Sequence, residues 1–209
     1  MISLSKGQTV SLAKSAPGAS KFIVGAGWDV KRGDTGLDFD IDIMAIAVGK
    51  DGKVRNETDF FYYGLGPKDD LGNLIKGKPF ANADGYLFHK GDNRDGQGDG
   101  DDEQIVFDPS KVPEAIDKVV ILLTIFDAET RKQQFGSIEN TFVRVVDAND
   151  ESNVDKTIRY EPNEEFSTET VVAVAEFYRY QGEWKIRAKG EGFNGGIVQA
   201  LASYGLQAS

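Results

Sequence analysis

Residues 170–189 read TVVAVAEFYRYQGEWKIRAK, and this stretch predicts two adjacent strands joined by a tight turn. Its two arms, residues 170–180 and 183–189, are rich in β-branched and aromatic side chains, which favour the pleated geometry of a strand. Gln181 and Gly182 lie between the arms, and glycine tolerates the positive φ that a two-residue hairpin turn requires. The stretch therefore predicts an antiparallel hairpin.

Short apolar runs separated by Gly, Asp or Asn continue along the rest of the chain, and a second turn is expected at residues 50–53. Helical spacing of apolar residues is confined to residues 109–116 and to residues 197–204, where Gly205 provides a stop. We expect an all-β fold, an antiparallel β-sandwich in which the C-terminal helix covers one open end of the core. The further strands are expected at residues 10–13, 22–25, 37–48, 59–63, 86–89, 104–107, 119–126, 140–146 and 157–160.

Length and composition narrow the class of protein. A chain of 209 residues can bury one substantial core, so a single domain spanning residues 1–209 is expected. With 34 acidic and 24 basic residues, the net charge of -10 disfavours nucleic acid and anionic membrane surfaces as partners and favours cations. Cysteine is absent, which excludes disulfides and thiolate chemistry. The first residues lack a signal-peptide pattern and no 18-residue apolar run occurs, so we expect a cytoplasmic protein without direct membrane insertion.

The densest negative charge lies in residues 91–103, which read GDNRDGQGDGDDE. Six carboxylates and one arginine give this loop a charge of -5. Two like charges about 4 Å apart near a protein surface repel by roughly 4 kcal/mol, so a compact loop requires a cation among them. Ca²⁺ accepts about 6 to 8 oxygen ligands in forgiving geometry, which suits such a loop. The loop therefore predicts a calcium site, with a solvated, disordered loop as the alternative.

The spacing of the loop separates it from two common calcium motifs. In an EF-hand that began at Asp95, Gly100 would fit position 6, but Val106 would stand where a bidentate Glu is required. Calcium β-rolls need tandem Gly-rich repeats, and only one copy is present. Neither motif accounts for the loop.

Residues 37–43, LDFDIDI, form a second acidic segment in which Asp38, Asp40 and Asp42 alternate with apolar residues. A strand would place the three carboxylates on one face, roughly 6 to 7 Å apart, a spacing that suits two ions better than one. Because Asp is a poor strand former, metal ligation by at least one of the three is favoured over a solvated edge strand.

These segments together resemble the TerD family of bacterial stress and tellurite-resistance proteins, over nearly the whole chain. The loop that runs from Gly-Asp-Asn to Asp-Asp-Glu is the most specific part of the resemblance. Ile43-Met44 follows the third Asp where relatives tend to have small residues, which affects packing more than ligation. The matching segments are residues 25–29, 38–42, 91–93, 98–103, 125–128, 135–136, 182–185 and 195–196.

The resemblance implies a calcium-binding β-sandwich with two Ca²⁺ ions, a cytoplasmic setting in bacteria, and a role in resistance to tellurite or other chemical stress. It further implies a non-enzymatic protein, whose partners include other stress-response proteins in a membrane-associated assembly. The implied calcium ligands are Asp38, Asp40, Asp42, Asp92, Asn93, Asp99, Asp101, Asp102 and Glu103.

Two other function classes stay open at this point. His89 stands directly before the acidic loop, and a histidine beside metal-binding carboxylates is compatible with a metal-dependent hydrolase of the phosphoesterase kind. A calcium-gated protein-interaction module is the other alternative. The sequence contains no Gly-x-Ser-x-Gly elbow and no Walker loop, so enzymes that depend on those motifs are disfavoured.

Overall fold

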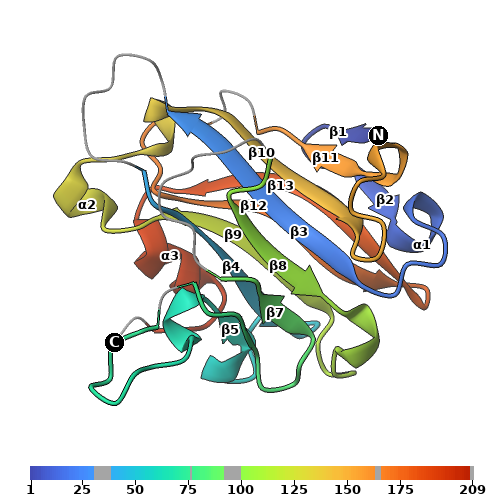
Figure 1. The fold of residues 1–209 in the computed structure, drawn as a ribbon, viewed down its shortest axis with the longest axis horizontal. Helices are drawn as coiled ribbons and strands as arrows, with labels where there is room; N and C mark the ends of the chain where they lie inside the picture. Colours follow the sequence, from blue (N-terminus) through green and yellow to red (C-terminus); the bar gives the residue numbers. More distant parts are fainter. Residues whose placement is uncertain (31–38, 76, 92–99, 163–165, 208–209) are drawn as a thin grey trace.

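The computed structural model describes residues 1–30, 39–75, 77–91, 100–162 and 166–207. Its strands form two sheets packed face to face, and in Figure 1 the sheet that contains β10, β3 and β8 lies in front of the other. Sheet 1 has the order β1-β11-β10-β3-β8-β7-β6 and sheet 2 the order β2-β13-β12-β9-β4-β5. The predicted β-sandwich is confirmed, although β1 and β11 pair in parallel.

The strands have the following bounds. Sheet 1 consists of β1 (Ile2–Leu4), β3 (Phe22–Val30), β6 (Phe80–Ala81), β7 (Leu87–His89), β8 (Glu103–Phe107), β10 (Ile138–Asp147) and β11 (Ile158–Tyr160). Sheet 2 consists of β2 (Thr9–Ser11), β4 (Ile41–Val48), β5 (Phe60–Phe61), β9 (Lys118–Ile125), β12 (Val171–Tyr180) and β13 (Glu183–Phe193). The helices are α1 (Leu12–Ser15), α2 (Ala128–Arg131) and α3 (Gly196–Ser203), with short 3₁₀ turns at η1 (Glu57–Asp59), η2 (Tyr63–Leu65), η3 (Pro109–Lys111), η4 (Phe135–Ser137) and η5 (Val154–Lys156).

The hairpin expected at residues 170–189 is present. β12 and β13 pair antiparallel from Tyr180 and Glu183 onward, and Gln181 and Gly182 have φ values of 51° and 80°. Two positive φ values define the type I′ turn, whose twist matches that of the flanking strands.

Other expected elements are shorter than the sequence suggests. Residues 109–116 form only the 3₁₀ turn η3, because Pro113 cannot donate the backbone hydrogen bond that would continue a helix. Residues 59–63 contribute two strand residues, flanked by η1 and η2. Of the strand expected at residues 37–48, β4 contains Ile41–Val48; Phe39 and Asp40 precede it, and residues 37–38 lie outside the described residues.

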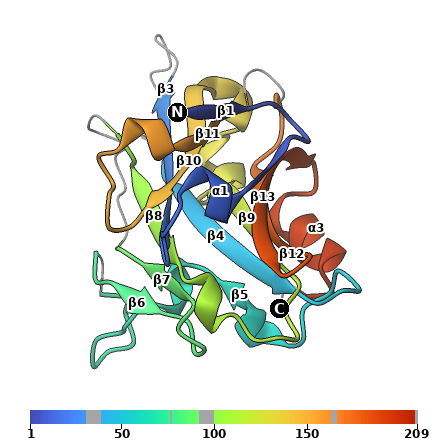
Figure 2. The same cartoon turned by 90° about the vertical axis from the view of Figure 1, so that its right-hand side faces the viewer.

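The C-terminal helix lies elsewhere than expected. α3 does not close an open end of the core; it packs on the outer face of sheet 2, as Figure 2 shows. All eight residues of β4 are buried, and so are seven of the eight residues of β9, because the core lies on one face and a second apolar cluster on the other. The near-continuous apolar runs of β4 and β9 are the sequence signal for strands covered on both faces. The second cluster comprises Met44, Ile46, Val48, Val120, Leu122, Val171, Ala173, Phe193, Ala200, Leu201 and Leu206.

Within the described ranges, no helix has both the length and the apolar character required to cross a membrane.

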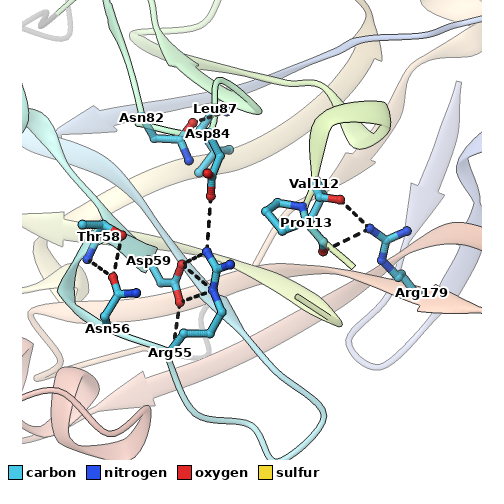
Figure 3. Close-up of polar contacts among 10 residues, drawn as sticks. All are labelled: Arg55, Asn56, Thr58, Asp59, Asn82, Asp84, Leu87, Val112, Pro113 and Arg179. Carbon is cyan, nitrogen blue, oxygen red and sulfur yellow. Dashed lines mark hydrogen bonds and ion pairs between the residues drawn. The ribbon is translucent and has the colours of Figure 1, made fainter. Parts of the chain in front are cut away.

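An ion pair with a buried carboxylate fixes the segment that leads from β4 to β5. Arg55 binds Asp59 through its Nη2 at 2.6 Å and its Nε at 3.0 Å, and it also reaches Asp84 at 3.2 Å (Figure 3). The side chain of Asp59 is 1% exposed, so the guanidinium supplies the charge that this buried carboxylate needs. The same carboxylate raises the pKa of Arg55. This pair holds η1 in place where the chain enters β5 of sheet 2.

Candidate functional site

One end of the sandwich brings together the segments that the sequence singles out. β8 begins at Glu103, which pairs with Ala26 in the middle of β3, and β4 begins at Ile41, which pairs with Ile125 at the end of β9. The end of the acidic loop, the Asp-rich segment and residues 125–128 therefore meet at this end. We call residues 39–43 and 100–103 of this region the acidic end.

Glu103 connects the two sheets at the acidic end. It is 2% exposed, and its Oε2 accepts a hydrogen bond of 2.8 Å from the backbone N–H of Ile43. The exit of the loop in sheet 1 is thereby joined to the start of β4 in sheet 2. The bond places Glu103 directly beside the segment that carries Asp40 and Asp42.

Asp102 ties the same arm of the loop to β3. Its backbone N–H donates to the carbonyl of Ala26 at 2.8 Å, and its Oδ2 accepts from the N–H of Trp28 at 3.1 Å. Asp102 is 9% exposed. One hydrogen bond to β3 thus holds the backbone of Asp102, and a second holds its carboxylate.

Asp101 points to a different set of partners. Its side chain is fully buried, its Oδ1 binds Nε of Arg144 at 2.6 Å, and its Oδ2 accepts from Gln104 at 2.8 Å. The carboxylate of Asp101 raises the pKa of Arg144, which also reaches Glu151 at 3.3 Å. Both carboxylate oxygens of Asp101 therefore accept hydrogen bonds within the protein, and each keeps a further lone pair.

Asp40 and Asp42 are both buried, at 6% and 3% exposure. The carbonyl of Asp40 accepts from the N–H of Phe126 at 2.8 Å, which fastens the segment before β4 to the chain that follows β9. Asp42 lies in β4 opposite Thr124, on the outer face of sheet 2. Together with Asp102 and Glu103, they make four buried acidic residues at one end of the molecule.

The remaining predicted ligands, Asp38, Asp92, Asn93 and Asp99, lie outside the described residues. Among the side chains that the structure does describe, no group of three His, Asp or Glu converges closely enough to hold a metal ion. The acidic end thus contains buried oxygen donors, and a complete ligand shell requires more than its described side chains.

His89 is buried within this region. It is 0% exposed, its Nδ1 accepts from the N–H of Gly91 at 3.1 Å, and its Nε2 lies 3.7 Å from Oε2 of Glu103. Its ring stacks on Phe80 with centroids 5.3 Å apart. The acceptor role of Nδ1 assigns the proton of a neutral ring to Nε2, facing Glu103. The enclosed imidazole therefore directs its Nε2 toward the carboxylate of Glu103. It has no exposed surface that could contact a substrate.

Sequence reasoning assigned no role to Arg144 or to the small residues of β3. A Cβ on Gly25 would overlap the carboxylate of Asp101, and a Cβ on Gly27 would lie 2.7 Å from the carbonyl of Gly100. The two glycines therefore let the arm at residues 100–101 cross closely over β3. Glycines alternating within a strand are a sequence signal for such a close backbone approach.

The fold and the acidic end together define a class of protein. It is a two-sheet β-sandwich with buried carboxylates where the end of an acidic loop meets an Asp-rich segment. The TerD domain model matches residues 1–204, and the chain belongs to the TerD family. It is 42% identical to tellurium resistance protein TerD of Serratia marcescens, over all of this chain and 99% of that protein. It is 43% identical to general stress protein 16U of Bacillus subtilis, over 99% of this chain and 98% of that protein.

A solved structure shares the fold. A Streptomyces coelicolor homologue of the telluride resistance protein TerD superposes with a TM-score of 0.61 at 21% identity, covering 85% of this chain and 92% of that one. The family thus includes proteins named for tellurium resistance and for general stress.

Proposed function

We propose that this chain is a non-enzymatic calcium-binding protein of the cytoplasmic response to tellurite and other chemical stress. One observation carries the proposal: Asp40, Asp42, Asp102 and Glu103 are all buried at the acidic end, which the bond from Ile43 to Glu103 holds together. The names of its relatives from Serratia marcescens and Bacillus subtilis support the stress role.

Physical chemistry links this burial to a cation. An ionised carboxylate removed from water costs several kcal/mol unless charge and hydrogen bonds compensate. The N–H groups of Ile43 and Trp28 satisfy acceptors on Glu103 and Asp102. A divalent cation would offset the mutual repulsion of carboxylates gathered at one end, and carboxylate oxygens are the ligands that Ca²⁺ prefers.

We further propose that the nine predicted residues supply the ligands of two ions. The set combines the loop residues Asp92, Asn93, Asp99, Asp101, Asp102 and Glu103 with Asp38, Asp40 and Asp42. Calcium supplies positive charge when bound, which offsets the mutual repulsion of these carboxylates. The acidic end, stiffened by calcium in this way, then forms a surface that other stress-response proteins bind.

Calorimetric titration with CaCl₂, together with thermal melts, tests the calcium proposal. At a calcium concentration 100 times the dissociation constant, binding stabilises the folded state by about 2.7 kcal/mol. For a chain of this size, the melting temperature should rise by roughly 5–10 °C. A titration without heat, accompanied by an unchanged melting temperature, would show that the acidic end is not a calcium site.

Paired substitutions locate the site. Asp40→Asn combined with Asp42→Asn should weaken calcium binding at least about tenfold, because two charged ligands are lost while the side-chain shapes are kept. The matched control is Glu114→Gln combined with Asp155→Asn, which removes the same charge from exposed positions away from the acidic end. If both double variants bind calcium alike, the effect is one of net charge and the ligand assignment is wrong.

A further inference from the structure

A hollow of about 530 Å³ opens on the outer face of sheet 2. It lies between α3 on one side and the segment that contains β5 and η2 on the other. Volumes of 300 to 1,000 Å³ are typical of sites for small molecules. The hollow is therefore large enough for a small organic ligand.

Aromatic side chains form one wall of this hollow. The ring of Tyr63 meets the rings of Tyr62 and Phe126 edge to face, with centroids 5.8 and 6.0 Å apart. Phe60 stacks on Tyr62 at 4.6 Å. Phe126 is 38% exposed, which leaves an aromatic surface available to a ligand. The ion pair of Arg55 and Asp59 holds the start of this wall (Figure 3).

The charged groups of the hollow are all acidic. Asp42 from β4, Glu57 from η1 and Asp127 after β9 line it, and no Lys, Arg or His does so among the lining residues that the structure describes. Asp42 is nearly buried, whereas Glu57 and Asp127 are exposed. Carboxylates beside exposed aromatic faces attract cations in two ways, through their charge and through the ring quadrupole.

We propose that this hollow is a binding site for a small organic ammonium ion with an apolar body. Ile197 and Leu201 of α3 line it opposite the aromatic wall and would contact the apolar body, while the ammonium group would lie among the carboxylates. An inorganic cation would leave the apolar surface unused, and an anion would be repelled. The proposal is separate from the calcium proposal, because Glu57, Asp127 and Tyr63 lie outside the predicted ligand set. Asp42 belongs to both sites, so calcium bound to Asp42 would reduce the negative charge of the hollow.

Three probes of equal size but different charge test the proposal on the full chain: benzylammonium, benzyl alcohol and benzoate. Amide NMR spectra are recorded during each titration in a buffer with a calcium chelator, so that Asp42 keeps its charge. Benzylammonium should shift the amides around Tyr63 and Phe126 and bind at least about fivefold more tightly than benzyl alcohol. Benzoate should leave these amides unchanged.

Matched variants assign the two parts of the recognition. Glu57→Gln combined with Asp127→Asn should weaken benzylammonium at least about fivefold and leave benzyl alcohol unchanged. Asn tolerates the left-handed backbone of Asp127, whose φ is 49°, so this double variant should keep the fold. Tyr63→Ala should weaken both probes. Glu114→Gln, which removes an exposed charge elsewhere, should weaken neither.

Several results would overturn the assignment. The assignment is wrong if the shifts caused by benzylammonium lie outside the hollow. It is also wrong if benzoate or benzyl alcohol binds as tightly as benzylammonium, because the charge is then not recognised. Binding of benzylammonium to the Glu57 and Asp127 double variant with unchanged affinity would show that the carboxylates play no part. Each outcome is read from the same spectra, which also report whether a variant is folded.

Discussion

Gly25 illustrates how one residue without a side chain controls the acidic end. The carboxylate of Asp101 occupies the space where a Cβ on Gly25 would stand, and from there it binds Arg144 at 2.6 Å. A glycine in a strand interior is unfavourable by itself, because it adds flexibility to the unfolded chain and packs nothing. Its presence in β3 is explained by the close passage of residues 100–101.

Gly25→Ala should therefore destabilise the protein by about 1–3 kcal/mol, because it displaces Asp101 from Arg144 and leaves charge poorly compensated. Urea denaturation measures the change. In an Asp101→Ala background the obstructing carboxylate is gone, so the same substitution should cost clearly less. Equal costs in the two backgrounds would mean that Gly25 does not act through Asp101.

Arg55 offers a second prediction at this scale. Arg55→Met should destabilise the fold by about 1–3 kcal/mol, because it leaves the carboxylate of Asp59 buried without its counter-charge. Asp84→Asn is the matched control within the same cluster. The side chain of Asp84 is 43% exposed, so the loss of its contact with Arg55 should change the free energy of unfolding by less than about 1 kcal/mol. A larger effect for Asp84 than for Arg55 would contradict this view.

At the scale of elements, the turn between β12 and β13 carries a residue that its backbone does not favour. Gln181 has a φ of 51°, a conformation in which Asn is several-fold more common than other non-glycine residues. Gln181→Asn should therefore stabilise the protein by about 0.3–1 kcal/mol, measured by thermal melts. A lower melting temperature would show that the side chain of Gln181 contributes more than its backbone costs.

Helix α3 provides the other prediction for an element. Leu201 is 8% exposed in the apolar cluster on the outer face of sheet 2, so Leu201→Ala should cost about 2–4 kcal/mol. Val198 lies in the same helix but is 58% exposed, and Val198→Ala should change stability by less than about 0.5 kcal/mol. Similar costs for both substitutions would place the stabilising contacts of α3 elsewhere.

For the whole molecule, the buried Tyr86 and the partly buried Tyr204 predict how stability responds to alkaline pH. Burial raises the pKa of Tyr86 and of Tyr204 well above the ordinary value near 10. Above pH 10 the unfolded chain therefore loses these protons while the folded chain retains them, so stability falls as pH rises. The slope should approach about 1.4 kcal/mol per pH unit for each group. In Tyr204→Phe the slope should be shallower, and an unchanged slope would remove Tyr204 from this account.

Much of this architecture was predictable because it depends on local patterns. The hairpin at residues 170–189 was predictable because its β-branched and aromatic residues and its turn residues specify it within twenty positions. The short strand β5 was harder to predict, because its pairing with β4 defines it. The early end of the helix expected at residues 109–116 was also harder to predict, because the ring of Pro113 alone causes it. Helix α3 was expected as a helix but on the wrong surface, because the sequence shows an apolar face without showing what it covers.

The candidate site divides in the same way. Residue types alone identified the acidic loop and the Asp-rich segment, since charge density and oxygen donors are properties of composition. Tertiary structure decided that Glu103 meets Ile43, that Asp101 pairs with Arg144, and that Asp42 faces a hollow beside Tyr63. These contacts join residues far apart in the chain, and their geometry depends on the packing of two sheets, which no local pattern encodes.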